Sequence, residues 1–243
     1  MAFLRTLFHR EREPAPLCSA VIVAAGRASR MEGIDKILTP MGGQPLLLYT
    51  LAPFQACEQV GEIVIVTRED LMVPIGTLCS QHGLTKVRRV VKGGESRTES
   101  VLAGLGETDP QAALVAIHDG ARPFLPEAVL EEAIQAAAQH GAAAPAIPVK
   151  DTIKVAQAGV VQSIPDRGQL FAVQTPQVFD RALLQEALGQ AAAEGLSLTD
   201  DCAAVERLGR PVYLTRGSED NLKITTPRDL TWGQAILAER MGR

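Results

Sequence analysis

Four charged side chains from three separated segments could form one cationic site around a single acid. Arg30 and Lys36 lie in or after the segment AAGRASRM, Asp119 stands in HDGARP, and Lys223 stands in EDNLKIT. Three cations and one carboxylate suit phosphoryl-type transfer, in which the protein supplies position and charge stabilisation instead of a covalent nucleophile. These segments can act together only if the fold brings them to one place.

The first segment, Ala24 to Met31, has the composition of a phosphate-binding loop. Its small residues let backbone N–H groups approach a phosphate, and Arg30 can add a planar, charge-assisted contact. The letters GRASRM match neither GxGxxG nor GxxxxGK[ST]. A glycine turn followed by two solvated cations is an equally good interpretation of this segment taken alone.

The HDGARP segment offers an acid and a second possible phosphate ligand. Asp119 could hold Mg²⁺ or its water, because Mg²⁺ bound to nucleotide phosphates takes one or two carboxylates; the alternative is an aspartate that caps the next turn. Arg122 precedes Pro123 on a constrained loop, so it could present its guanidinium to a phosphate or be an ordinary surface arginine. We interpret His118 as a packed, hydrogen-bonded histidine.

Short β-rich runs alternate with longer helical patterns over the first 141 residues, which indicates βαβ units and a mostly parallel sheet. Ser96 and Glu99 have capping-box spacing, and Pro126 lies near the first position of an Ala-rich helix. Ligands of such sheets bind at the carboxyl ends of the strands. The predicted strands are Ala20–Ala24, Glu62–Thr67, Val87–Val91 and Leu114–Ile117, and the predicted helices are Pro45–Cys57, a stretch to about His82, Ser96–Leu105 and a stretch from Pro126 to about Gly141.

The alternation breaks between about residues 149 and 175. Two β-like segments flank Ala158 and Gly159 with no helix between them, which predicts a hairpin on an arm that leaves the main sheet. Arms of this type often pair across a dimer. Beyond it we expect helices from about Asp180 and Thr199, a strand at Pro211–Thr215, Lys223 on an edge strand, and a final helix after Pro227.

The composition excludes several other classes of protein. The 243 residues carry 24 Lys plus Arg and 28 Asp plus Glu, a net charge of -4, and only 4% aromatic residues, which argues against a nucleic-acid-binding surface. Four isolated cysteines fit a reducing compartment, and no apolar run reaches the roughly 18 residues of a membrane span. We expect a cytoplasmic protein with a flexible extension over residues 1–17 and a single domain over residues 18–243.

Several motifs run in the order of one enzyme family from Ala20 to about Leu230. They are AAGxxxRM with a following lysine, GGxxRxxSV (Gly93 to Val101), HDGARP, PVKDTIK (Pro148 to Lys154), TPQ (Thr175 to Gln177) and DNLKIT (Asp220 to Thr225). Together they closely resemble the 2-C-methyl-D-erythritol 4-phosphate cytidylyltransferase family. The resemblance implies a Rossmann-like three-layer α/β nucleotidyltransferase fold with a mostly parallel twisted sheet and a protruding β-arm at about 149–175.

The activity implied by the resemblance is transfer of a cytidylyl group from CTP to 2-C-methyl-D-erythritol 4-phosphate. The products are 4-diphosphocytidyl-2-C-methyl-D-erythritol and pyrophosphate, in isoprenoid precursor biosynthesis by the non-mevalonate route. Such an enzyme would need Mg²⁺ or another divalent cation and would work as a homodimer through the arm. It would bind neither nucleic acid nor membrane.

The resemblance also assigns residues to roles. The catalytic residues would be Arg30, Lys36, Arg167 and Lys223, and Asp119 would be the acid at the metal. CTP would be bound by Ala24, Ala25, Gly26, Arg30, Lys36, Gly94, Glu95, Ser100 and Asp119. The second substrate would be bound by Arg122, Thr152, Arg167, Thr175 and Lys223, with Thr152 coming from the partner subunit.

Three positions depart from the family pattern. Ala28 replaces a frequent glycine, Asp35 precedes the lysine where Pro or Asn is common, and Glu95 stands where Asp is also common.

The main alternative function is that of a cytidylyltransferase for ribitol 5-phosphate or another polyol phosphate. A non-catalytic nucleotide-binding module would be expected to lack the charged set, and a dinucleotide-binding dehydrogenase would be expected to carry GxGxxG.

Overall fold

The computed structural model describes residues 18–26 and 37–242, so the predicted extension over 1–17 lies outside the described residues, as do Arg30 and Lys36. Among the described residues, eight strands form one sheet in the order β10-β7-β11-β6-β1-β4-β5, with β12 also pairing with β7. Strands β1, β4, β5 and β6 are mutually parallel, and β11 enters antiparallel between β6 and β7. The strands are β1 (Cys18–Val23), β4 (Val60–Thr67), β5 (Val87–Lys92), β6 (Leu114–Asp119), β7 (Ala142–Pro148), β10 (Phe171–Val173), β11 (Gln177–Asp180) and β12 (Tyr213–Arg216).

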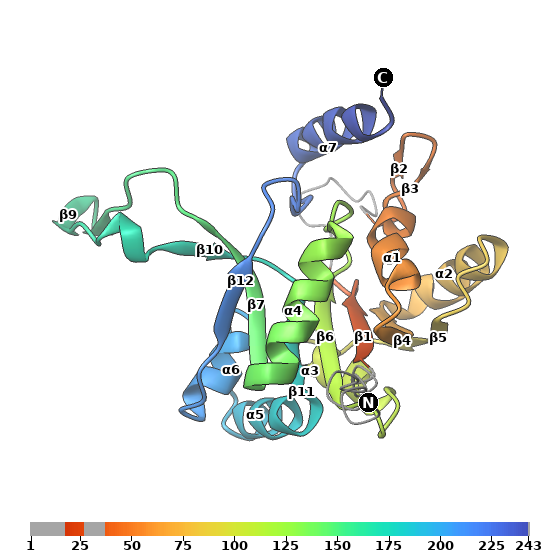
Figure 1. Ribbon diagram of the computed structural model, residues 1–243, viewed down its shortest axis with the longest axis horizontal. Helices are drawn as coiled ribbons and strands as arrows, with labels where there is room; N and C mark the ends of the chain where they lie inside the picture. The colour runs from red at the N-terminus through yellow and green to blue at the C-terminus, as the bar shows by residue number, and fades with distance from the viewer. Residues whose placement is uncertain (1–17, 27–36, 243) are drawn as a thin grey trace, which may run out of the picture.

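Helices cover both faces of this sheet, which makes the arrangement three-layered (Figure 1). Helices α1 (Leu46–Ala56), α2 (Glu69–Gln81) and α4 (Glu127–His140) bury apolar side chains against one face. Helices α3 (Arg97–Gly106), α5 (Arg181–Ala193) and α6 (Cys202–Arg207) do so against the other. The expected Rossmann-like α/β architecture is therefore confirmed.

The continuous apolar sequence of β1 follows from this double coverage. Ala20 and Ile22 belong to the core on the α1 face, whereas Val21 belongs to the core on the α3 face. A strand covered on both faces has no need for the polar alternation of a half-exposed strand. The same holds for β6, all six of whose residues are buried.

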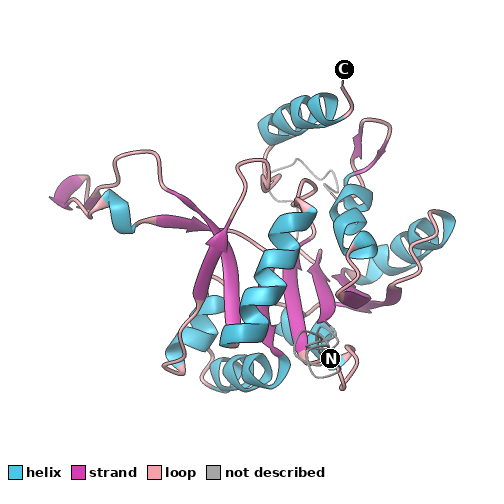
Figure 2. Cartoon of the chain, viewed as in Figure 1, coloured by secondary structure: helices cyan, strands magenta, loops and turns pink. Residues whose placement is uncertain are grey.

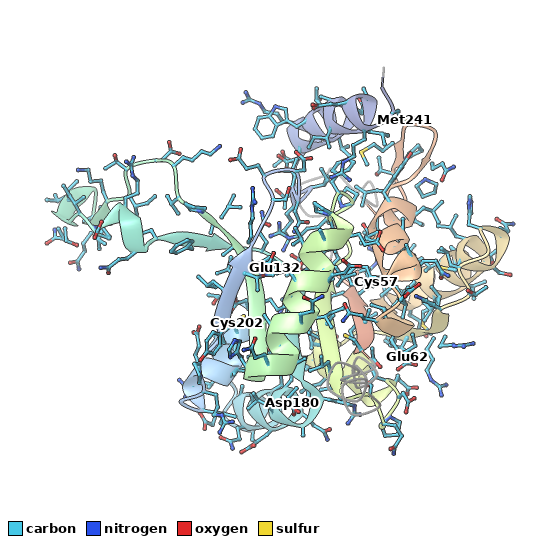
Figure 3. The ribbon with its side chains drawn as sticks, in the orientation of Figure 1. Cys57, Glu62, Glu132, Asp180, Cys202 and Met241 are labelled. Carbon is cyan, nitrogen blue, oxygen red and sulfur yellow. The ribbon has the colours of Figure 1, made fainter. Side chains whose placement is uncertain are left out.

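The predicted hairpin is confirmed and forms the tip of the arm. Strands β8 (Val155–Gln157) and β9 (Val160–Ser163) pair antiparallel, and Ala158 and Gly159 between them have φ of 48° and 80°. Two consecutive positive φ angles are what a two-residue hairpin loop requires. The arm stands away from the sheet, and its side chains project into open space around it (Figures 1 and 3).

The last helix, α7 (Pro227–Arg240), packs beside the short hairpin of β2 (Pro40–Met41) and β3 (Gln44–Pro45) (Figure 2). A capping box at Thr226 and Asp229 begins the helix. A separate small core joins this layer to the loops below it and consists of Met41, Leu46, Phe124, Ile224 and Leu237. Because Phe124 directly follows HDGARP and Ile224 belongs to DNLKIT, α7 helps to hold those motifs in place.

Two local expectations need correction. The helix expected from Thr199 begins at Cys202, and Lys223 lies in a loop between β12 and α7 instead of on a strand. The error at Thr199 concerns where a helix begins, which local patterns define poorly because the end of an element depends on its tertiary neighbours. The error at Lys223 concerns the type of structure, since β12 ends at Arg216 and no strand follows it in the described residues before α7. Pro126, expected near the first position of a helix, is the N-cap of α4, directly before its first helical residue, as predicted.

All four cysteines are free and buried, and Figure 3 shows Cys57 at the end of α1 and Cys202 at the start of α6, well apart. In residues 18–26 and 37–242, no helix combines the length and apolar character needed to cross a bilayer.

Candidate functional site

The carboxyl ends of three parallel strands meet at one edge of the sheet. Val23 at the end of β1 lies beside both Asp119 of β6 and Val66 of β4, and Gly93 donates its N–H to Thr67 O, 2.8 Å away. The segments that begin at Ala24, Gly93 and Asp119 therefore leave the sheet next to one another. This is the edge at which ligands of such sheets bind.

Asp119 is the centre of a cluster of charges at this edge. Its Oδ2 lies 2.9 Å from Nζ of Lys223 and 3.3 Å from Nε of Arg122, and the residue is only 8% exposed. Burial alone would raise the pKa of Asp119, but the cations, Lys223 first and then Arg122 and Arg97, outweigh it and lower the pKa to about 2. The carboxylate is thus ionised at neutral pH and ready to interact with cations.

Arg122 is a bridge between two segments, not an ordinary surface arginine, and its side chain is only 13% exposed. Besides its contact with Asp119, its Nη1 donates to the backbone O of Asn221 at 2.6 Å. The N–H of Ile224 donates to Ala121 O at 2.8 Å, which makes a second link between the same two segments. The HDGARP and DNLKIT motifs, far apart in the sequence, are therefore joined by their own polar groups.

Thr175 and His118 form a hydrogen-bonded chain that holds the backbone of Asp119. The N–H of Asp119 donates to Oγ1 of Thr175 at 3.1 Å, and that oxygen lies 3.0 Å from Nδ1 of His118. The Nε2 of His118 faces the carbonyl of Arg122 at 3.2 Å, so we assign the proton to Nε2 and the Thr175 hydroxyl as donor to Nδ1. The interpretation of His118 as a packed, hydrogen-bonded histidine is confirmed, since it is fully buried and its ring lies 5.0 Å from that of Phe54.

The segment from Gly93 to Ser100 approaches the end of β1 closely. A Cβ on Gly93 would lie 2.5 Å from Cβ of Ala25, so only glycine permits this approach. The hydroxyl of Ser100 accepts from Gly94 N at 3.2 Å and donates to Ser96 O at 2.9 Å, which holds the loop against α3. Two segments expected to bind CTP are thus neighbours.

The expected capping box at the start of α3 is formed only in part. Ser96 Oγ accepts from the N–H of Glu99 at 3.1 Å, as predicted. The Glu99 carboxylate accepts instead from the N–H of Glu95, at 2.7 Å. The consequence is that both the Gly94 and Glu95 backbone groups are held by side chains of α3, while the Glu95 side chain is exposed.

A buried ion pair lies next to this cluster and has no counterpart among the residues expected from the sequence. Arg97 Nη1 is 2.7 Å from Oδ1 of Asp201, whose side chain is 1% exposed. Burial raises the pKa of Asp201, and Arg97 offsets this only in part. Oδ2 of Asp201 is buried without a hydrogen-bond partner in the described part of the chain, and Gln177 Oε1 accepts from the Asp201 N–H at 3.0 Å.

Thr152 and Arg167 are not brought to Asp119 within one chain. Both are exposed and lie on the arm, where Arg167 Nη1 donates to Lys150 O at 3.2 Å. The base of the arm touches the Lys223 loop through Lys150 and Glu219, whose charged atoms are 2.5 Å apart. The other two expected cations, Arg30 and Lys36, lie outside the described residues, so the structure bears on neither.

Two buried amides, Gln174 and Asn221, complete the surroundings of the cluster and were not expected from the sequence. Asn221 is 0% exposed and Gln174 is 6% exposed, and both contact the segment that carries Thr175. The only local signal was their position next to the motifs TPQ and DNLKIT, since nothing in a single sequence distinguishes a buried amide from a solvated one.

The residues fit a nucleotide-associated metal better than a metal held by protein alone. Within residues 18–26 and 37–242, no group of three or more His, Cys, Asp or Glu could enclose an ion. Asp119 nevertheless presents a buried, ionised carboxylate, a hard oxygen donor at the strand end. Mg²⁺ commonly takes one or two carboxylates together with waters and substrate phosphates.

Comparison with known proteins assigns this geometry to one family. Residues 18–239 match the family model described as 2-C-methyl-D-erythritol 4-phosphate cytidylyltransferase. A protein of that name from Halalkalibacterium halodurans is 43% identical over 226 residues, which cover 93% of this chain and 99% of the relative. Another from Caldanaerobacter subterraneus subsp. tengcongensis is 42% identical, covering 90% and 98%.

Solved structures agree with the sequence relatives. A 4-diphosphocytidyl-2C-methyl-D-erythritol synthase from Anaerococcus prevotii superposes with a TM-score of 0.83 at 31% identity, covering 92% of this chain and 96% of that one. A 2-C-methyl-D-erythritol 4-phosphate cytidylyltransferase from Thermus thermophilus superposes with a TM-score of 0.74 at 33% identity, covering 89% and 97%. These names do not favour the alternative function, that of a cytidylyltransferase for ribitol 5-phosphate.

Proposed function

The chain belongs to the 2-C-methyl-D-erythritol 4-phosphate cytidylyltransferase family, and we propose that the charge cluster centred on Asp119 is where it carries out that reaction. The enzyme transfers the cytidylyl group of CTP to 2-C-methyl-D-erythritol 4-phosphate and releases pyrophosphate. The observation that carries the site assignment is the single carboxylate oxygen of Asp119 held between Lys223 and Arg122 at the carboxyl edge of the sheet.

The reaction does not require the protein to remove a proton from the nucleophile. An oxygen of the substrate phosphate attacks the α-phosphorus of CTP in line with the departing pyrophosphate. This nucleophile is already anionic near neutral pH, because the second pKa of a phosphate ester is about 6. The protein therefore needs to supply position and positive charge but no general base.

Lys223 is the cation whose role is best supported. Its side chain is 43% exposed, so the ammonium can reach a ligand at the edge of the sheet while remaining beside Asp119. There it stabilises the charge that develops on the α-phosphate and orients the incoming phosphate. Arg122 is more deeply buried and acts at the wall of the second-substrate pocket, near Thr175.

The cytidine half of CTP binds between the end of β1 and the start of α3. The backbone at Ala24, Ala25 and Gly26 and the loop at Gly94 and Glu95 supply the contacts, with Ser100 holding the loop. Arg30 and Lys36, in the segment that follows Gly26, contact the triphosphate and stabilise the transition state. Asp119 would hold Mg²⁺ or another divalent cation, which would neutralise charge on the triphosphate when bound.

The arm completes the site in a homodimer. Its exposed apolar side chains include Val155, Val160 and Ile164, which are 49%, 63% and 60% exposed. A lone two-stranded hairpin is at best marginally stable in water, and clustered exposed apolar residues favour a partner surface. Pairing of two arms would bring Thr152 of the partner subunit and the partner's Arg167 toward the substrate phosphate. Residues 18–243 then act as one domain, working in the cytoplasm, where four free cysteines stay reduced.

The test is pyrophosphate release by purified protein given CTP, Mg²⁺ and either 2-C-methyl-D-erythritol 4-phosphate or ribitol 5-phosphate. We expect turnover with the first and not the second, and a loss of kcat on the order of 10²–10³-fold in Lys223→Ala, by analogy with oxyanion-hole donors. Lys86→Ala is the matched control, since Lys86 precedes β5 at the opposite edge of the sheet. A Lys223→Ala enzyme as fast as the control would overturn the site assignment.

A further inference from the structure

Lys223 lies in a loop without regular structure, yet its ammonium is held 2.9 Å from Asp119. The loop runs from Gly217 to Thr225, between β12 and α7. A long, flexible side chain contributes to a transition state only if its backbone is held, because a misplacement of about 1 Å can cost 10²-fold in rate. The polar contacts of this loop show what holds it.

Asn221 anchors the loop from the inside. Its side chain is fully buried, and its Nδ2 donates to the backbone O of Thr175 at 2.8 Å and to Oε1 of Gln174 at 3.3 Å. Its Oδ1 is buried and has no hydrogen-bond partner in the described part of the chain. The amide therefore acts on its neighbours through its two N–H donors.

Gln174 anchors the start of the same loop. Its Nε2 donates to Ser218 O at 2.8 Å, and its Oε1 accepts from Ser218 N at 3.2 Å, so one side-chain amide pairs with both backbone groups of Ser218. The backbone of Gln174 is itself held, since its N–H donates to Pro145 O of β7 at 2.7 Å. We call the side chains of Gln174 and Asn221 the amide clamp.

The clamp ties the loop to the same segment that supports Asp119. Thr175, whose carbonyl accepts from Asn221, also accepts the Asp119 N–H through its hydroxyl. Arg122 donates to the carbonyl of Asn221 and contacts the Asp119 carboxylate. Asp119 and the loop that carries Lys223 are thus both hydrogen-bonded to the same buried segment, Gln174 to Thr175. This shared anchor fixes the distance between the two side chains.

We propose that Gln174 and Asn221 are positioning residues that hold Lys223 in the geometry the reaction needs, an inference that rests on the proposed role of Lys223. Neither side chain is free to touch a substrate, because both are buried and their N–H groups are engaged with the protein. Their effect on the rate therefore passes through Lys223 and disappears when the lysine is absent.

The experiment is a pair of double-mutant cycles. Asn221→Leu and Gln174→Met each keep roughly the side-chain size but remove the donating NH₂ without adding a charge, and each is made in the wild-type and Lys223→Ala backgrounds. In the wild-type background we expect kcat to fall about 10- to 100-fold, with the KM for CTP changing less than about threefold, because the clamp does not contact the Gly94 loop. In the Lys223→Ala background the same substitutions should lower kcat less than about threefold.

Gln55→Met is the matched control, because Gln55 also accepts a backbone N–H, from Lys86, and donates to Thr85 Oγ1, both at 3.0 Å, on another face of the molecule. It should leave kcat unchanged in both backgrounds. Thermal unfolding of every variant checks folding, and if Asn221→Leu does not fold, Asn221→Ser, which retains one short donor, takes its place in the cycle.

The outcomes separate the inference from the function on which it rests. Equal fold losses in the two backgrounds, or clamp variants with wild-type kcat, would overturn the positioning role while leaving the enzyme assignment intact. If Lys223→Ala alone retained wild-type kcat, the assignment of the site would fail first.

Discussion

The hydroxyl oxygen of Thr175 lies 3.0 Å from Nδ1 of His118 and also accepts the backbone N–H of Asp119. The hydroxyl proton of a residue expected to bind substrate is therefore already engaged with the protein. One acceptor lone pair remains for a ligand, and Thr175 is only 4% exposed. Its first contribution is to hold the backbone of Asp119 at the end of β6.

Replacing Thr175 with valine should lower both stability and rate. The substitution keeps the shape but leaves the Asp119 N–H and His118 Nδ1 unpaired in the interior, which we expect to cost about 2 kcal/mol of unfolding free energy and to lower kcat through a displaced Asp119. Urea unfolding and steady-state kinetics measure the two effects. Thr175→Ser, which retains the hydroxyl, should stay near wild type in both.

Thr108→Val separates the kinetic effect from simple destabilisation. Thr108 is equally buried, with its hydroxyl donating to Leu105 O at 2.7 Å, but it follows α3 and lies away from the carboxyl ends of the strands. It should lose comparable stability without losing kcat. If both valine variants kept full kcat per folded molecule, Thr175 would have no role in positioning Asp119.

The buried His118 should make the protein less stable as the solution becomes acidic. Burial lowers the pKa of His118 from 6.5 to about 4. Between these values the unfolded chain binds a proton that the folded chain does not, so unfolding free energy falls as pH falls from about 6.5 to about 4. The loss attributable to this residue is about 3 kcal/mol over that window.

The measurement is urea unfolding of wild type and His118→Gln at several pH values from 4 to 7. Glutamine does not titrate and can still offer an N–H toward the Arg122 carbonyl. The stability advantage of wild type over the variant should shrink as pH falls. A constant difference across the window would show that His118 titrates with an ordinary pKa in the folded state.

The Arg97–Asp201 ion pair should be important for stability despite being a single pair. Arg97→Ala would leave the almost fully buried Asp201 carboxylate without its cation, and we expect a loss of about 3 kcal/mol at pH 7. Adding Asp201→Asn to that variant should restore part of the loss by removing the buried charge. Arg207→Ala is the control, since the Arg207–Glu194 pair is 54% exposed on both sides and should cost less than about 1 kcal/mol. Similar losses for the two single variants, measured by urea unfolding, would contradict the prediction.

The arm should control both dimer formation and the binding of the second substrate, the polyol phosphate. We expect Val160→Asp with Val161→Asp to convert a dimer to monomers in sedimentation, because each apolar side chain would be replaced by a charge in the shared interface. The KM for the polyol phosphate should rise about tenfold or more, equivalent to about 1.4 kcal/mol of lost binding, while the KM for CTP stays nearly unchanged. Val73→Asp, on α2 and 78% exposed, should alter neither property. A wild-type protein that sediments as a monomer would remove the basis for a shared site.

Much of the fold could be predicted because it rests on local patterns. The apolar β-branched runs, the longer helical stretches between them and the Ala158–Gly159 turn each specify an element without reference to the rest of the chain. Boundaries failed where tertiary contacts decide them, as at Thr199, where residues 199–201 lead into α6 and Asp201 is held by Arg97 and Gln177.

The buried polar residues could not be predicted in the same way. His118 and Asp119 lie on β6, whose residues are buried on both faces, so no alternation of polar and apolar residues reveals which face each side chain meets. Asn221 and Gln174 have the same amide chemistry as a solvated glutamine, and their donors find partners only because loops from β10, β12 and α7 converge.

By itself the sequence determined the alternating α/β architecture, the arm, and the identity of the charged side chains, since those depend on residue type and local order. Only the tertiary structure decided which charges meet. Arg122 and Asn221 are 99 residues apart, and Arg97 and Asp201 are 104 apart, yet both pairs are in contact. These pairs are in contact because of how the layers pack across the sheet. Burial removes competing water, so each buried polar group must find its partner within the protein.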